Sequence, residues 1–515
     1  MKEKLLSALQ QKPYFLVLLP VFFIIHGYND LFGFFSLQFV LFNFIATLLT
    51  AFILFIVSVS LFKMKQKRYI YTFWLLLIVL IFGSFHDGLK IIFHQGFFSS
   101  YKFILSLLLI FFLILFLYIK KRNSLFHHSF NFLNLLFLFL LLFELITGLV
   151  NFKEYQKGNN ILDNRFNTYN SYNPQTQIPD SEKPDIYFLV FDGMPSTKAM
   201  QSTWNYNNST LDSFLRKEKF FISEDSKSNY NLTVLSLSST LNMDYNPPID
   251  IFQDEVKMYF KASSSILNNS LTKILTKEGY QIFQYQPVSF NNKDWDGSLF
   301  FKNMLYLNFF YKTLPGRIYR DLGWHFSNLK IKFIDKFYES QYEKRNIKAE
   351  KDLDQLIKLV KNSCGIEKTN SQFVYAHFVL PHDPLIFDSS GKRKETRLTI
   401  QLSESEQVYA FIDQVKYANK VINQLVSHIK HNNKANTVII VEGDHGYRNI
   451  YGQKGYMIFE NLNAIYLPGK DSVTLYSSIS PVNSFRIILN KYFSANLPLL
   501  KDSSIFIPYT LTGEK

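Results

Sequence analysis

The hydrophobic pattern of the chain changes near residue 150. Before it, apolar residues run on for about 20 positions at a time, the length that a helix needs to cross the hydrocarbon core of a bilayer. After it, short apolar runs alternate with segments of helical periodicity, and polar residues separate them. The pattern therefore predicts an N-terminal bundle of five transmembrane helices over residues 1–150. The five stretches are 13–29, 37–62, 69–86, 101–119 and 128–150.

Basic residues near these stretches predict how the bundle is oriented. They lie before the first stretch, between the second and third, and between the fourth and fifth, whereas the alternate loops hold only Lys90 and Lys102. Cytoplasmic loops carry the excess of Lys and Arg, so the N-terminus is expected in the cytoplasm. Five crossings then place residues 151–515 outside, as the periplasmic part of a multi-pass inner-membrane protein. The basic residues are Lys2, Lys4, Lys12, Lys63, Lys65, Lys67, Arg68, Lys120, Lys121 and Arg122.

The part outside the membrane begins with a polar linker over 151–183 and continues as a folded domain over 184–515. Continuous apolar strands separated by helices predict an α/β domain with a mainly parallel sheet, covered by helices on both faces. Strands are predicted at 185–191, 281–287, 373–381 and 435–442, and helices at 208–219, 232–242, 270–280, 407–431 and 480–493.

Candidate metal ligands follow three of these strands. Asp192 ends the run YFLVF, and Asp444 and His445 end the run TVIIVEG. His377 and His382 lie in and just after FVYAHFVLP. Ligands of parallel sheets bind beyond the carboxyl ends of the strands, and carboxylates with imidazoles suit Zn²⁺ or Mn²⁺. Asp before Gly is also ordinary turn chemistry, but DG after one buried strand and GDHG after another together favour a metal site.

A site built from two aspartates and a histidine leaves a coordination position open, which is typical of catalytic metals. It then needs a nucleophile. Ser196 and Thr197 are near in sequence but follow a proline turn, and we interpret them as turn residues. In SNYNLTVLSLSSTLN, Thr233 falls at a helix N-terminus, where free N–H groups and the helix dipole favour an anion. The alternative for Thr233 is an ordinary N-cap residue.

The ordered set YFLVFDG, SNYNLTVLSLSSTLN, HFVLPHDP and EGDHG resembles the alkaline phosphatase/sulfatase superfamily. Apolar spans followed by an outer domain resemble its membrane-anchored branch, which includes lipid A phosphoethanolamine transferase and lipoteichoic acid synthase. The resemblance implies an alkaline-phosphatase-like domain. Matched position by position, it implies that Asp192, Thr233, Asp444 and His445 bind the metal, that Thr233 is the nucleophile, and that His382 binds substrate.

Two further residues are candidates for substrate binding. His377 could equally be a packed strand histidine, and Arg448, just past DHG, could equally be a surface residue. Two departures from the family matter. Sulfatases use a Cys or Ser that becomes formylglycine, which disfavours sulfatase chemistry at Thr233. The membrane transferases usually have Glu where this chain has Asp192.

The resemblance thus implies a membrane-anchored, metal-dependent transferase with one divalent metal, Zn²⁺ first and Mn²⁺ or Mg²⁺ as alternatives. It would move a phosphoethanolamine or phosphoglycerol type of group from a phospholipid to an envelope glycan or lipid through a phospho-threonine. One alternative is a membrane-anchored phosphodiesterase or phosphatase. Another is a catalytically degenerate membrane sensor or scaffold.

Three other features bear on partners, disulfides and membrane contact. The net charge of +14 comes without a dense basic run in the outer domain, so no nucleic-acid partner is expected. Cys364 is the only cysteine, which excludes a disulfide within the chain. The aromatic run NMLYLNFFYKTLPGRIY at 303–319 is open to two interpretations, a lipid-facing amphipathic surface or packing in a core near the membrane.

Overall fold

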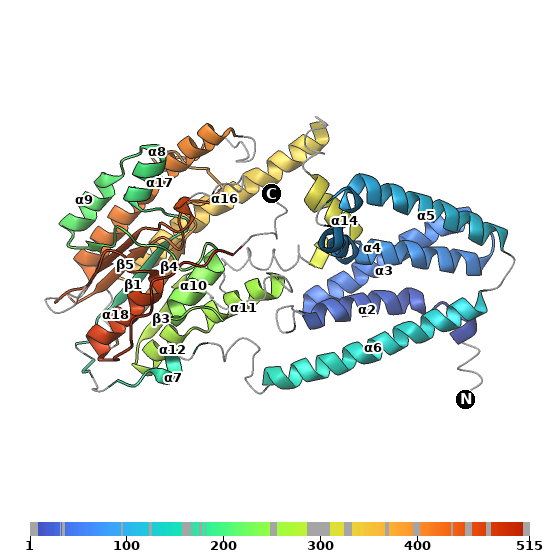
Figure 1. The fold of residues 1–515 in the computed structure, drawn as a ribbon, viewed down its shortest axis with the longest axis horizontal. Coiled ribbons are helices and arrows are strands. Elements are labelled where there is room, and N and C mark those ends of the chain that lie inside the picture. The colour runs from blue at the N-terminus through green and yellow to red at the C-terminus, as the bar shows by residue number, and fades with distance from the viewer. Residues whose placement is uncertain are drawn as a thin grey trace. The chain divides into compact units, whose positions relative to one another are not determined.

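The structure is a computed structural model that divides into two compact units (Figure 1). The membrane unit comprises Met1–Asn160 and Lys302–Ile334, and the catalytic unit comprises Ile161–Phe301 and Asp335–Lys515. The described residues are 9–30, 32, 37–93, 96–122, 126–156, 166, 168–174, 178–180, 182–247, 255–285, 309–323, 332–365, 370–394, 402–433, 436–448, 456–469 and 475–507.

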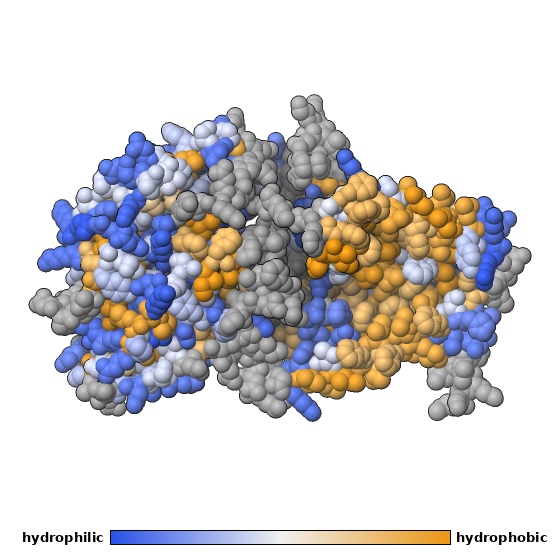
Figure 2. Space-filling view, viewed as in Figure 1, coloured by the Kyte–Doolittle hydropathy of each residue, from blue (hydrophilic) through white to orange (hydrophobic). Residues whose placement is uncertain are grey.

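Long apolar helices dominate the membrane unit. Within the described part of the chain, four of them are long and apolar enough to cross a membrane, and Figure 2 shows a largely apolar surface over this unit. The helix that precedes them, α2 (Phe15–Asp30), has 16 residues. Four of the five predicted stretches are therefore confirmed as long apolar helices, and the first remains a prediction as a span. The four helices are α3 (Leu37–Leu61), α4 (Lys65–Phe93), α5 (Tyr101–Lys121) and α6 (His127–Gln156).

Helix α2 runs alongside α6 in the same direction. Near its start, the Phe15 amide donates to Asn134 Oδ1 at 2.7 Å. At its end, Asn151 Nδ2 donates to the Asn29 carbonyl at 3.2 Å. Between them, the buried Glu144 carboxylate contacts the His26 ring at 2.8 Å. The 17 positions from Asn134 to Asn151 correspond to about 25 Å of α6, and the 14 positions from Phe15 to Asn29 to about 21 Å of α2.

A six-stranded sheet forms the centre of the catalytic unit, in the order β2-β6-β5-β1-β4-β3. The strands β5, β1, β4 and β3 are parallel to one another. At one edge, β6 pairs antiparallel with β5 and with the edge strand β2. Every residue of β1 is buried, which explains the unbroken apolar run YFLVF. The mostly parallel α/β sheet is confirmed. The strands are β1 (Ile186–Phe191), β2 (Phe221–Ile222), β3 (Gln281–Tyr285), β4 (Gln372–Phe378), β5 (Val438–Glu442) and β6 (Asn463–Tyr466).

Helices cover both faces of this sheet because side chains alternate along each strand. Leu189 and Phe191 of β1 belong to the core on one face, and Phe188 and Val190 belong to the core on the other. The first face packs against α8 (Thr197–Trp204), α9 (Ser209–Lys217), α16 (Lys332–Asn362) and α17 (Glu404–Asn432). The second packs against α10 (Thr233–Asn242), α11 (Glu255–Leu267), α12 (Ser270–Lys277) and α18 (Pro481–Phe493).

Candidate active site

The carboxyl ends of β1 and β5 bring the predicted acidic ligands together. The two strands are parallel neighbours, with Val190 paired to Glu442, so the residues after them emerge at the same edge of the sheet. Asp192 follows β1 directly, and Asp444 follows β5 after one glycine. Both aspartates are buried. The parallel sheet therefore places at one point two carboxylates that are far apart in sequence.

Two glycines allow this close approach. Gly193 has φ of 71°, and a Cβ there would lie 3.4 Å from His445 Cε1, so a side chain would meet both backbone strain and the ring. A Cβ on Gly446 would lie 1.7 Å from the Met457 carbonyl oxygen. The glycines of DG and DHG are thus required by backbone conformation and packing around the site.

Hydrogen bonds fix which atoms of Asp444 and His445 face the site. Asp444 Oδ1 accepts from the amides of Gly193 at 2.8 Å and His445 at 3.0 Å, which leaves Oδ2 without a donor. His445 Nδ1 lies 2.6 Å from the Gly446 carbonyl and must carry the proton to donate to it. In the neutral ring, His445 Nε2 then presents a lone pair, as a metal ligand requires.

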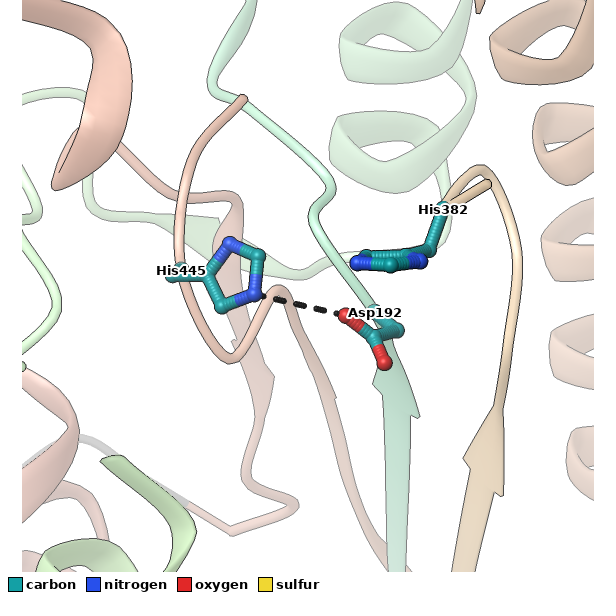
Figure 3. Close-up of side chains that lie close together, drawn as sticks. All are labelled: Asp192, His382 and His445. Atoms are coloured by element: carbon teal, nitrogen blue, oxygen red, sulfur yellow. Dashed lines mark ion pairs between the residues drawn. The ribbon is translucent and has the colours of Figure 1, made fainter. Parts of the chain in front are cut away.

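Three acceptor atoms surround His445 Nε2. It lies 3.4 Å from Asp192 Oδ1, 3.5 Å from Asp444 Oδ2 and 3.2 Å from Thr233 Oγ1. Figure 3 shows His445 and Asp192 pointing toward one another. Asp192 Oδ1 and Asp444 Oδ2 are buried and accept no hydrogen bond from any residue that the structure describes. A tetrahedral Zn²⁺ with bonds of about 2.0–2.1 Å holds its ligand atoms about 3.3 Å apart, and the three distances to Nε2 are close to that spacing. Among the described residues, the ligand atoms lie within 4.8 Å of one another in two groups, Asp192 with His382 and His445, and Asp192 with His377 and Asp444.

Thr233 reaches this point as the first residue of α10. The N-cap is Leu232, and no side chain caps the helix, so the Thr233 hydroxyl does not have the N-cap role. Ser236 Oγ, one turn later, donates to the Asp444 carbonyl at 2.5 Å and ties α10 to the end of β5. Thr233 itself is only partly buried. Its hydroxyl thus faces His445, and the residue is not fully closed off from solvent.

His382 and Arg448 lie together beside this group. Arg448 Nη2 is 3.2 Å from His382 Nε2, and Arg448 Nη1 donates at 3.3 Å to the carbonyl of Asn231, two residues before Thr233. His382 Nδ1 faces the Asp383 carbonyl at 2.9 Å. Figure 3 shows His382 close to Asp192 and His445, and these three residues could together hold one ion. The structure therefore brings two of the three predicted substrate-binding residues, His382 and Arg448, beside this group.

His377 lies deeper, on β4. Its side chain is 2% exposed, and its Nε2 atom is 3.4 Å from Asp192 Oδ2. Neither ring nitrogen has a hydrogen-bond partner among the described residues. His377 can also join Asp192 and Asp444 as a possible metal-binding group. It faces the carboxylate of Asp192 from within the sheet, where a substrate would reach it less easily than His382.

Two buried acids near the site have pKa values that shift in opposite directions. Burial alone would raise the pKa of Asp192, but His382, His377 and His445 more than offset this effect and hold the pKa well below its usual range. Glu442, at the end of β5, has no such neighbours, and burial raises its pKa well above the usual range. These shifts favour the charged form of Asp192 and the neutral form of Glu442.

Ser196 and Thr197 do not join the site. Ser196 is the N-cap of α8, with its hydroxyl accepting from the Ala199 amide at 3.2 Å. Thr197 Oγ1 donates to Asp212 at 3.0 Å.

Two residues that sequence reasoning missed hold the site in place: Gly193, whose amide orients Asp444, and Ser236. The only signals for them are the DG turn and the spacing of one helical turn after Thr233.

Comparisons with known proteins place this site in a family context. A sequence model of the sulfatase family, described as "Sulfatase", matches residues 185–475. No curated protein matches the chain.

Solved structures of bacterial envelope enzymes are similar at low identity. The periplasmic domain of EptC from Escherichia coli in complex with Zn has 9% identity and a TM-score of 0.36, covering 63% of this chain and 86% of that chain. Lipooligosaccharide phosphoethanolamine transferase A from Neisseria meningitidis has 11% identity and a TM-score of 0.37, covering 93% of this chain and 95% of that chain. Lipoteichoic acid synthase LtaP from Listeria monocytogenes has 9% identity and a TM-score of 0.36, covering 65% of this chain and 80% of that chain.

Proposed function

Because the chain belongs to the sulfatase family, we propose that it is a membrane-anchored, metal-dependent phosphotransferase. Its substrate would be a phospholipid, from which it moves a phospho-alcohol group to an envelope glycan or lipid. The observation that carries this proposal is that three acceptor atoms, from Asp192, Thr233 and Asp444, lie 3.2 to 3.5 Å from His445 Nε2. One of the three is the hydroxyl of Thr233, which is only partly buried, so the group is a candidate for catalysis as well as for metal binding.

The identity of the hydroxyl argues against sulfate ester hydrolysis. Sulfatases use a Cys or Ser whose Cβ is oxidised to the aldehyde of formylglycine. The Cβ of Thr233 carries a methyl group, so oxidation there would give a ketone. A threonine hydroxyl serves instead as a direct nucleophile. Phosphoryl transfer through a phospho-threonine therefore fits this chain better than sulfatase chemistry.

A divalent metal bound by Asp192, Asp444 and His445 would favour the alkoxide form of Thr233. A ligand set of two carboxylates and one imidazole suits Zn²⁺ best, with Mn²⁺ as the alternative and Mg²⁺ less suited to the imidazole. His377, 3.4 Å from Asp192 Oδ2, would hold that carboxylate in position. Asp444 Oδ1 is already held by two backbone amides, so only its Oδ2 is available.

The chain's own residues account for both halves of the transfer. Thr233 Oγ1 attacks phosphorus, a new oxygen–phosphorus bond forms, and the bond to the lipid alcohol breaks. Thr233 loses its proton on attack and the leaving alcohol takes one up, and His382 Nε2 is a candidate carrier of that proton. Arg448 Nη2, 3.2 Å away, would hold phosphoryl oxygens. In the second half, an acceptor hydroxyl attacks the phospho-threonine and loses a proton, and Thr233 is released and regains one.

The membrane unit supports a lipid substrate. Four helices are apolar enough to span a bilayer, and α2 lies along α6 over about 21 Å. We take α2 as a fifth span, which together with the basic residues of the alternate loops would put the N-terminus in the cytoplasm and the catalytic unit in the periplasm. An enzyme held at that surface meets phospholipid head groups directly.

The test is intact-mass spectrometry of the full-length protein after incubation with phospholipids of defined head group. We expect an adduct on Thr233 whose mass equals the transferred phospho-alcohol, and no adduct on Thr233→Ala. An adduct on another residue would refute the assignment of the nucleophile. Release of the phospho-alcohol into water in the presence of glycan and lipid acceptors would favour a hydrolase. Absence of bound metal together with absence of turnover would favour a sensor or scaffold.

A further inference from the structure

A segment in the middle of the catalytic sequence packs with the membrane unit. Residues 309–323 lie between β3 and α16, and they fall inside the stretch 185–475 that the family match covers. They nevertheless belong to the compact unit of the apolar helices. The segment contains two short helices, α14 (Leu314–Arg317) and η2 (Ile318–Leu322). We call residues 309–323 the strap.

The strap contacts α4 at a glycine. The Gly83 amide donates to the Lys312 carbonyl at 2.8 Å, and the Gly83 carbonyl accepts from Arg317 Nη2 at 3.2 Å. A Cβ on Gly83 would lie 2.3 Å from the Tyr311 carbonyl oxygen. Any other residue at position 83 would therefore push the strap away from the helix.

A second glycine receives the start of the strap on α2. A Cβ on Gly27 would lie 2.4 Å from Phe309 Cε2. The Phe309 ring is 5% exposed and packs on Phe23 and Phe39, at centroid distances of 5.1 and 5.6 Å. The first residue of the strap is thus seated in an aromatic site that only a glycine on α2 leaves open.

Charged and polar pairs link the strap to three helices. Lys312 Nζ lies 2.9 Å from Asp30 Oδ2 at the end of α2. Arg317 pairs with Asp87 of α4, and its side chain is 4% exposed. At the start of α5, the Tyr101 hydroxyl donates to Asp321. These pairs join the strap to the C-terminal ends of α2 and α4 and to the N-terminal end of α5.

The contact with Gly83 lies at membrane depth. The basic first turn of α4, which ends at Arg68, marks one membrane interface. Gly83 is about 22 Å further along the helix axis, within a hydrocarbon core of about 30 Å. Irregular backbone is tolerated at such depth only when protein groups satisfy it. Gly83 does so for the Lys312 carbonyl, and Arg317 Nε does so for the Tyr311 carbonyl at 2.9 Å.

We propose that the strap is a re-entrant segment, inserted among α2, α4 and α5, that attaches the catalytic unit's chain to the membrane unit independently of the linker at 151–183. Its partner is the polar and aromatic surface at these helix ends. Phe310 and Tyr319 remain 40% and 50% exposed, as expected for aromatic side chains at a membrane interface. The two interpretations of the aromatic run 303–319 then apply to different side chains of one segment. This proposal does not rest on the proposed function.

The test cuts the linker in full-length protein and asks whether the strap alone keeps the two fragments together. A site for a specific protease is inserted in the linker at 160, and the protein carries an N-terminal affinity tag. After solubilisation in mild detergent and cleavage, we expect the C-terminal fragment to remain with the tagged N-terminal fragment. Lys312→Asp should lower its recovery by about tenfold. The exchanged pair Asp30→Lys with Lys312→Asp should restore recovery, which would exclude simple misfolding.

A matched pair of substitutions on α4 tests the same contact from the membrane side. Gly83→Leu should release the cleaved fragment, because the strap backbone occupies the space of its side chain. Gly88→Leu is the control, since nothing lies within 4 Å of a Cβ at Gly88. Release of the wild-type fragment on cleavage would overturn the proposal. Full retention by both Lys312→Asp and Gly83→Leu would overturn it as well.

Discussion

The Nε2 atom of His445 lies 3.2 Å from the Oγ1 atom of Thr233, across a sequence separation of 212 residues. The imidazole cannot turn away, because its other nitrogen bonds the Gly446 carbonyl at 2.6 Å. The threonine cannot move far, because Ser236 ties the same turn of α10 to Asp444. The site is therefore organised before any substrate arrives, as catalysis by positioning requires.

Replacing Thr233 tests this arrangement most directly. Thr233→Ala removes the proposed nucleophile, and we expect transfer to fall by about 10³-fold or more. Thr233→Ser keeps a hydroxyl and should retain measurable activity with the adduct on the new serine. Both variants should fold, since the side chain does not cap α10. Activity of Thr233→Ala close to the wild type would show that the hydroxyl is not the nucleophile.

Replacing a metal ligand should make the melting temperature of the protein nearly independent of added metal. If the protein binds Zn²⁺ at Asp192, Asp444 and His445, wild type at about 1,000 times the Kd gains about 4 kcal/mol on metal addition. Asp444→Asn lacks one anionic ligand, so its melting temperature should respond little to Zn²⁺ or EDTA. Elemental analysis of both purified proteins gives the metal content. Equal metal content in the two proteins would contradict the ligand assignment.

The sequence predicted the acidic half of this site because the position of each acid just after a buried strand is a local pattern. Asp192 and Asp444 each follow a buried apolar run, and parallel strands end at one edge. The superfamily resemblance is confirmed by the family match over 185–475. Thr233 was different. Nothing in its own helix distinguishes it from a capping residue, and only the resemblance singled it out. The atoms that face the metal position depend on amide and carbonyl bonds that no sequence pattern displays.

The strap shows a limit of another kind. Residues 309–323 carry apolar and aromatic side chains typical of any core, and the chain before 302 and after 334 belongs to the catalytic unit. Residues 309–323 pack with the membrane unit because Gly27 and Gly83 leave room for them, and in the sequence these two look like ordinary glycines in apolar helices. A long-range pairing of this sort is decided by shape, which hydrophobic periodicity does not encode.

Gly193 offers a test that separates backbone strain from site geometry. Gly193 and Gly279 both have positive φ, 71° and 84°, and alanine at either position should cost about 1 kcal/mol of stability. Only at Gly193 would the added Cβ meet the rings of His445 and His382, at 3.4 and 3.7 Å. We expect Gly193→Ala to weaken Zn²⁺ binding and transfer, whereas Gly279→Ala changes only the unfolding temperature. Similar metal affinities in the two variants would mean that the rings tolerate the methyl group.

The buried acid behind the site predicts a pH dependence. Glu442 is fully buried, its Oε2 accepts from Ser484 at 3.4 Å, and burial raises its pKa well above the usual range. The unfolded chain has the ordinary pKa of about 4.3. Since the folded pKa is the higher one, folding takes up a proton. The contribution to stability is complete below the unfolded pKa and is lost as the pH rises through the folded pKa.

Glu442→Gln removes the titrating group while keeping its shape. After treatment with EDTA, the unfolding temperatures of full-length wild type and Glu442→Gln should diverge as the pH rises from about 5 to about 9, with wild type falling further. Glu404→Gln changes an exposed glutamate on α17 and is the control for the loss of one carboxylate. Parallel curves for wild type and Glu442→Gln would mean that Glu442 is already ionised in the folded protein. The site would then carry a third negative charge, and a divalent ion would bind it more tightly than Asp192 and Asp444 alone would allow.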